Sequence, residues 1–213
     1  FRQPSTNIPD EIISLTGIDS SMVAGAIIDE KSLNAFVEDS DFIIAHNAAF
    51  DRKFVERLWE IFKRKPWICS LKDINWREEG LSSATLSSIL NFYEFFTDGA
   101  HRAIEDCYML LAILTQRLPT SGEMVIKKLL SEVSKMTYRI YAENSPFEMK
   151  DVLKKRGYYW SNGTGGLPKA WWKDFNEADR NAELKFLKAE VYKREVDIIC
   201  KEISPLDRYS IRA

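Results

Sequence analysis

Two aspartates stand at positions where a buried helix surface is expected. Their neighbours at helical spacing are mostly apolar: Ala48, Phe54 and Val55 around Asp51, and Ala103, Met109 and Leu110 around Asp106. Burying an unpaired carboxylate costs several kcal/mol, so each aspartate needs a partner. A divalent cation is one such partner, because hard cations prefer carboxylate oxygens. Neighbouring arginines and backbone N–H groups are the alternative.

The chain has only two histidines, and each precedes one of these aspartates by five residues. An imidazole changes its charge near neutral pH, which suits it to proton transfer. We expect a catalytic role for His101, which lies before Asp106. For His46 we expect a structural hydrogen bond across the turn between a strand and the helix that follows it.

The elements around these residues follow the order strand, helix, strand. Residues 42–45 are a short apolar run, typical of a parallel strand that is buried on both faces. An amphipathic helix follows to about residue 62, and residues 67–71 indicate a second strand. The apolar positions of that helix are Phe50, Phe54, Val55, Leu58 and Phe62. This order predicts an α/β fold, in which sites form just past the carboxyl ends of the strands.

The chain divides into an expected α/β domain over residues 1–118, a connecting helix within 119–136 and a small α+β module over 137–213. Further helices are expected over residues 32–39, 84–96 and 102–117. Residues 1–136 carry 15 Lys and Arg against 20 Asp and Glu, whereas residues 137–213 carry 15 against 12. The acidic part suits a metal site, and the basic part suits contact with a polyanion.

Composition places the chain among ordinary globular proteins. Hydrophobic residues make up 45% and charged residues 29% of 213 residues, with a net charge of −2. No apolar run approaches the length of a membrane-spanning helix, so no membrane contact is expected. The three cysteines are far apart, which favours reduced thiols in a cytoplasmic protein and excludes a clustered zinc site.

The C-terminal module is rich in aromatic residues. Two short segments, at residues 158–160 and 170–172, predict a hairpin, residues 138–142 a strand, 147–156 a helix and 177–202 a long final helix. The aromatic and basic side chains suit stacking against single-stranded nucleic acid, with Trp160, Trp171 and Lys173 as candidate contacts. The alternative is that these rings form the core of a small module that has little else to bury.

Two segments of the first domain resemble motifs of a known enzyme family. Residues 43–51, Ile-Ile-Ala-His-Asn-Ala-Ala-Phe-Asp, resemble the second motif of the DEDDh (RNase T/DNA polymerase III epsilon-like) family of 3′→5′ exonucleases. Residues 101–106, His-Arg-Ala-Ile-Glu-Asp, resemble the third. Residues 145–173 also resemble a small accessory module that follows some bacterial exonuclease domains.

The resemblance implies an RNase H-like fold and two divalent ions, Mg²⁺ or Mn²⁺, that serve hydrolysis at a 3′ end. Carried over by position, Asp51 and Asp106 are metal ligands and His101 is the general base. Asn47, Phe50 and Arg102 are expected to contact the substrate. The expected partners are a nucleic acid 3′ end, DNA rather than RNA, and a polymerase or another replication or repair protein.

The first motif of this family, Asp-x-Glu on the first strand, has no counterpart in the sequence. We expect it on strands that precede residue 1, in about 50 further residues. The 213 residues alone are then expected to be inactive, and a second fragment or a homo-oligomer is expected to cover the open sheet. The alternatives are a natural, non-catalytic module that binds nucleic acid or a polymerase, and an exonuclease that acts on RNA ends.

Overall fold

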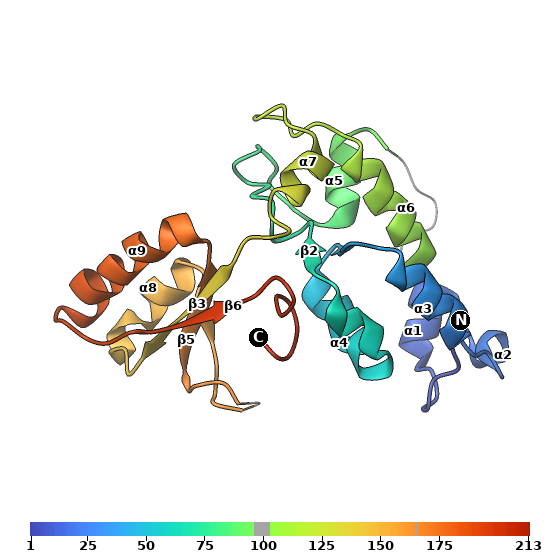
Figure 1. Ribbon diagram of the computed structural model, residues 1–213, viewed down its shortest axis with the longest axis horizontal. Coiled ribbons are helices and arrows are strands. Elements are labelled where there is room, and N and C mark those ends of the chain that lie inside the picture. The colour runs from blue at the N-terminus through green and yellow to red at the C-terminus, as the bar shows by residue number, and fades with distance from the viewer. Residues whose placement is uncertain (96–102, 165) are drawn as a thin grey trace. The chain divides into compact units, whose positions relative to one another are not determined.

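A computed structural model describes residues 1–95, 103–164 and 166–213 (Figure 1). The chain forms two compact units, residues 1–133 and residues 134–213. Each unit has its own sheet and its own hydrophobic core.

The first unit is mainly helical around a short parallel strand pair. Its elements, in chain order, are α1 (Asp10–Thr16), α2 (Ser20–Val23), α3 (Glu30–Glu38), β1 (Ile43–Ala45), α4 (Ala48–Leu58), the 3-10 helix η1 (Glu60–Arg64), β2 (Trp67–Cys69), α5 (Leu86–Phe92), α6 (Ala103–Leu114) and α7 (Val125–Leu130). β1 and β2 are parallel, with Ile43 opposite Trp67. The predicted strand–helix–strand unit is therefore confirmed.

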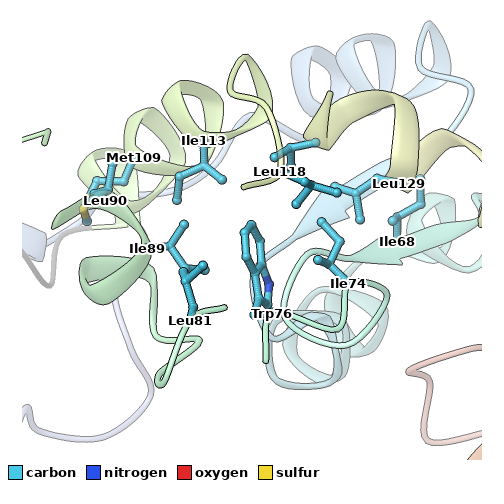
Figure 2. Packing of buried hydrophobic residues seen from close by; sticks show 11 residues of the cluster. Ile68, Ile74, Trp76, Leu81, Ile89, Leu90, Met109, Ile113, Leu118 and Leu129 are labelled. Atoms are coloured by element: carbon cyan, nitrogen blue, oxygen red, sulfur yellow. The ribbon is translucent and has the colours of Figure 1, made fainter. Parts of the chain in front are cut away.

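The core of the first unit is built around a loop residue, Trp76. Figure 2 shows its indole between Ile89 and Leu81 on one side and Ile74 on the other. The indole Nε1 donates a hydrogen bond to the carbonyl of Ser70, at 2.7 Å, so the ring is buried with its polar atom satisfied. This bond ties Trp76 to the residue directly after β2, and the ring packs in the same core as residues of α5 and α6.

Helix α4 is oriented differently from what its apolar pattern predicts. The stripe that was expected to face the core is exposed, with Phe50 at 60%, Phe54 at 55% and Leu58 at 42% of their possible area. The helix also ends at Leu58, and Phe62 lies in η1, where it is buried. The prediction that one apolar face runs from residue 50 to residue 62 is thus wrong.

Contacts with β2 explain this orientation. Ala48 is fully buried, and its backbone N–H lies 3.3 Å from the sulfur of Cys69. One and two turns later, Arg52 and Glu56 form a buried ion pair, and the Arg52 guanidinium lies over the ring of Trp67 at 5.4 Å. A small residue followed by a paired cation and anion therefore packs on β2, and the phenylalanines face outward.

The second unit is a four-stranded antiparallel sheet with helices on one face (Figure 1). Its elements are β3 (Thr137–Glu143), the 3-10 helix η2 (Phe147–Met149), α8 (Lys150–Lys155), β4 (Tyr159–Trp160), β5 (Ala170–Phe175), α9 (Glu177–Phe186), a π-helical segment η3 (Leu187–Tyr192) and β6 (Ile199–Ile203). The strand order is β4-β5-β3-β6. The predicted β4–β5 hairpin pairing and the β3 strand are confirmed.

The predicted long final helix is wrong. Helix α9 ends at Phe186, η3 follows, and Lys193 adopts a left-handed conformation with φ of 52°. The chain then returns as β6, which pairs antiparallel with β3. This strand satisfies the second edge of β3, which a continued helix would have left without hydrogen-bond partners.

Candidate active site

The structure brings Asp51 and Asp106 into one electrostatic environment. Asp51 lies in the first turn of α4, just after β1, and Asp106 lies in the first turn of α6. Crowding by protein atoms raises the pKa of the Asp51 carboxyl, and the negative charge of Asp106 raises that pKa further. The Asp51 side chain nevertheless remains open to solvent. The charge of Asp106, on α6, thus influences the exposed carboxylate of Asp51, which lies past the end of a parallel strand.

A cysteine that sequence reasoning did not select lies in the same environment. Burial raises the pKa of the Cys107 thiol, and the charges of Asp106 and Asp51 raise it further. The charges of Asp51 and Asp106 therefore act on the Cys107 thiol as well. The only signal in the sequence was that Cys107 directly follows Asp106.

His46 joins the ends of the two parallel strands. Its Nδ1 lies 2.9 Å from the hydroxyl of Ser70, which is buried directly after β2. Burial lowers the pKa of this imidazole, a backbone contact at Ala84 opposes that effect, and the charge of Asp106 opposes it as well. We had expected a hydrogen bond across the turn between β1 and α4. The bond runs instead to the residue that follows the neighbouring strand β2.

The structure describes only two of the four other site residues that were predicted in the first unit. His101 and Arg102 lie outside the described residues. Asn47 is exposed in a left-handed conformation, with φ of 69°, and makes the turn between β1 and α4. The Phe50 ring packs against Phe54 with centroids 5.1 Å apart. Both side chains are therefore accessible beside Asp51.

The carboxylates do not form a complete ligand set by themselves. In the residues that the structure describes, no group of three or more His, Cys, Asp or Glu side chains could hold a metal ion. Divalent ions usually take several oxygen ligands. Asp51 and Asp106 fit a part of such a site, since both supply acidic oxygen donors and the charge of one influences the other.

The two edges of the parallel strand pair differ in a way that matters for this site. At the outer edge of β2, the Asp73 carboxylate accepts a hydrogen bond from the Cys69 N–H at 2.7 Å. Within the described part of the chain, β1 pairs only with β2. The β1 edge, next to the start of α4, has no paired strand among the described residues.

The candidate contacts in the second unit lie on one face of its sheet. Trp160 and Trp171 are opposite each other in the β4–β5 pair. Lys173 follows two residues later in β5, on the same face because side chains alternate along a strand. The Lys173 ammonium, however, donates a hydrogen bond to the carbonyl of Arg156 at 2.9 Å.

Comparison with known proteins places the first unit in a family. The model of the RNase T family, described as an exonuclease, matches residues 1–114, which is more than half of the 213 residues. The chain belongs to this exonuclease family. The matched residues include Asp51, Asp106 and the turn that joins β1 to α4.

Three curated relatives are similar to the chain. DNA polymerase III subunit epsilon of Aquifex aeolicus is 30% identical over 121 residues, covering 54% of this chain and 60% of the relative. DNA polymerase III PolC-type of Caldanaerobacter subterraneus is 30% identical over 139 residues, covering 63% and 10%. DNA polymerase III PolC-type of Clostridium perfringens is 29% identical over 119 residues, covering 54% and 8%.

The chain thus spans less than two thirds of the length of each of these relatives. No solved structure is significantly similar to it. None of the helices in the described ranges combines the length and the apolar character that crossing a membrane requires.

Proposed function

We propose that this exonuclease-family chain belongs to a metal-dependent enzyme that removes nucleotides from the 3′ end of DNA. The observation that supports the proposal is that the charge of Asp106, on α6, raises the pKa of the Asp51 carboxyl, on α4, past the end of β1. Two nearby carboxylates repel each other, so a site that holds them together is suited to a cation. The polymerase names of the relatives favour DNA as the substrate.

In this proposal Asp51 and Asp106 are ligands of two Mg²⁺ or Mn²⁺ ions. The ions supply activation of water and stabilisation of the oxygen that leaves the scissile phosphate. His101 takes the proton of the attacking water, and Arg102 contacts the phosphate. Asn47 and Phe50 meet the terminal nucleotide, which is consistent with their exposure beside Asp51.

We further propose that an Asp and a Glu on an added strand complete the ligand set. The open edge of β1 is the place for this strand, because Asp73 already occupies the outer edge of β2. A strand at that edge ends near the start of α4 if it runs parallel to β1. The 213 residues alone are then expected to bind divalent ions weakly and to lack nuclease activity.

The decisive experiment uses the full-length protein and a single-stranded DNA oligonucleotide labelled at its 5′ end. Wild-type protein with Mg²⁺ should give a ladder that shortens from the 3′ end, and a 3′-terminal phosphorothioate should slow it. Asp106→Asn should abolish this activity without a change in circular dichroism, because it removes one negative ligand and keeps the side-chain size. Glu105→Gln is the matched control on the same helix and should remain active.

Other outcomes have definite meanings. Full activity of Asp106→Asn would remove Asp106 from the site and overturn the proposal. Binding of DNA without any hydrolysis by the full-length wild type would favour the non-catalytic alternative. Faster shortening of an RNA oligonucleotide than of DNA would keep the site and change the substrate.

A polymerase subunit is the proposed protein partner, and the cytoplasm is the proposed location.

A further inference from the structure

One segment of the second unit combines aromatic rings with a local excess of positively charged residues. Residues 152–173 contain five Lys and Arg and five Tyr and Trp, with no Asp or Glu. They form the end of α8, the edge strand β4 and most of β5. A segment of this composition is attractive to a polyanion and offers flat surfaces for stacking.

Trp160 is the most suitable ring in this segment. Its side chain is 51% exposed on the edge strand, although it belongs to a cross-strand pair with Trp171. The two ring centroids are 5.6 Å apart. Trp171 in turn packs against the core that includes Ala142 and Leu153. The inner ring therefore holds the outer ring in place and leaves much of its surface accessible.

The charges near Trp160 are not used by the fold. Lys154 and Lys155 are exposed in the last turn of α8, five and four residues before β4 begins, and Lys169 is exposed directly before β5. In the described part of the chain, none of these three ammonium groups forms an ion pair. They are therefore available to phosphates, in contrast to Lys173, whose ammonium is hydrogen-bonded to a backbone carbonyl.

The opposite face of the same hairpin lacks this combination. Tyr159 packs on Trp172, with centroids 5.4 Å apart, and the guanidinium of Arg139 lies over Trp172 at 4.2 Å. Arg139 is held by both carboxylate oxygens of Asp174, at 2.7 and 2.8 Å. The cation on that face is thus already neutralised, although an exposed ring is present there as well.

We propose that Trp160 is a stacking site for a base of single-stranded nucleic acid, and that Lys154, Lys155 and Lys169 contact the adjacent phosphates. This inference deepens the proposed function and rests on it for the class of ligand. A single strand fits better than a duplex, because only unpaired bases expose a face to a protein ring. An acidic peptide would use the lysines, but it has no base to stack on Trp160.

The test measures binding of a fluorescein-labelled oligo(dT) to the 213-residue chain by fluorescence anisotropy. EDTA is present throughout, so that no metal-dependent hydrolysis takes place. Trp160→Leu should weaken binding about tenfold, which corresponds to about 1.4 kcal/mol and lies within the range for one stacked base. Trp160→Phe keeps a flat ring and should restore most of the affinity. Tyr159→Leu, on the other face, should bind like the wild type.

Two further measurements separate stacking from charge. An abasic oligonucleotide of equal length should bind the wild type about as weakly as oligo(dT) binds Trp160→Leu. The double variant Lys154→Ala/Lys155→Ala should reduce the slope of log affinity against log salt concentration by about 1.4, or 0.7 for each lost phosphate contact. Equal binding of the abasic oligonucleotide, or an unchanged slope, would overturn the proposal.

The design also separates this site from the proposed catalytic site. If Trp160→Phe, Trp160→Leu and Tyr159→Leu all bind oligo(dT) equally, or if the wild type does not bind it, the stacking site is excluded. That result leaves the role of Asp106 to be decided by the nuclease assay. Conversely, activity that survives Asp106→Asn would overturn the catalytic assignment, while a selective effect of Trp160→Leu would still support stacking.

Discussion

The buried ion pair of α4 provides the most direct test of how this helix is oriented. The Arg52 and Glu56 side chains expose only 0% and 3% of their area, and Arg52 Nε lies 2.6 Å from Glu56 Oε1. Glu56→Ala removes the carboxylate and keeps the guanidinium buried over Trp67. Removing one partner of a buried ion pair typically costs about 3–5 kcal/mol.

The double variant Arg52→Met/Glu56→Leu should behave differently. It removes both charges and keeps apolar volume against Trp67, and such replacements are neutral or stabilising. We expect its stability to lie within about 1 kcal/mol of the wild type or above it. With the single variants Arg52→Met and Glu56→Leu completing the cycle, the coupling energy should exceed about 2 kcal/mol, which is typical of residues in direct contact.

Hydrogen exchange of backbone amides in α4 and β2, measured by mass spectrometry, reports the free energy of opening in this region. An exposed pair provides the matched control: Lys63 Nζ lies 2.6 Å from Glu60 Oε2, with side chains 32% and 66% exposed. Glu60→Gln should change stability by less than about 0.5 kcal/mol. If Glu56→Ala costs no more than this control, the ion pair is not buried and α4 presents its phenylalanines to the core.

Two further predictions concern the same helix. Because burial and the charge of Asp106 raise the pKa of Asp51, the folded state binds this proton more tightly than the unfolded state, and stability decreases as pH rises through the two pKa values. Asp51→Asn should therefore raise the melting temperature of the metal-free chain at pH 7. The increase should be no more than about 2 °C, because solvent screens the site. Differential scanning fluorimetry should show no difference between the two proteins at pH 3. Phe54→Ser, on the exposed stripe, should change the free energy of unfolding by less than about 0.5 kcal/mol, whereas Phe62→Ala, in buried η1, should cost about 3–5 kcal/mol; equal effects in urea titrations would contradict the orientation of α4.

Every strand of the described residues except β6 could be predicted from local sequence, because the signals are short and contiguous. The apolar run before His46 and the aromatic segments at residues 158–160 and 170–172 are such signals. Their pairing, parallel in the first unit and antiparallel in the second, followed from the element that connects them. The hairpin needed no information from distant residues.

The final helix could not be predicted in the same way. The charged residues after Glu177 favour a helix, and nothing in their local pattern indicates where it stops. The stop depends on Lys193, a non-glycine residue in a left-handed conformation, and on the free edge of β3 that β6 then occupies. The pairing with β3 is a tertiary contact, so propensity over a short window does not contain it.

The acidic part of the candidate site was visible in the sequence, and its surroundings were not. Asp51 and Asp106 stood out as carboxylates among apolar neighbours, and the charge of Asp106 raises the pKa of Asp51. The bond from His46 to Ser70 joins residues 24 positions apart. The role of Asp73 at the edge of β2 depends on loop geometry after the strand. Both contacts require the folded chain.

The orientation of α4 connects the exposed stripe to the candidate site. Successive helix residues are rotated by about 100°, so Asp51 lies between the outward-facing Phe50 and the buried Arg52. The anchoring of Ala48 on β2 therefore both exposes the phenylalanines and keeps the Asp51 carboxylate accessible. One helix orientation thus accounts for the exposure of both the Asp51 carboxylate and the phenylalanine rings.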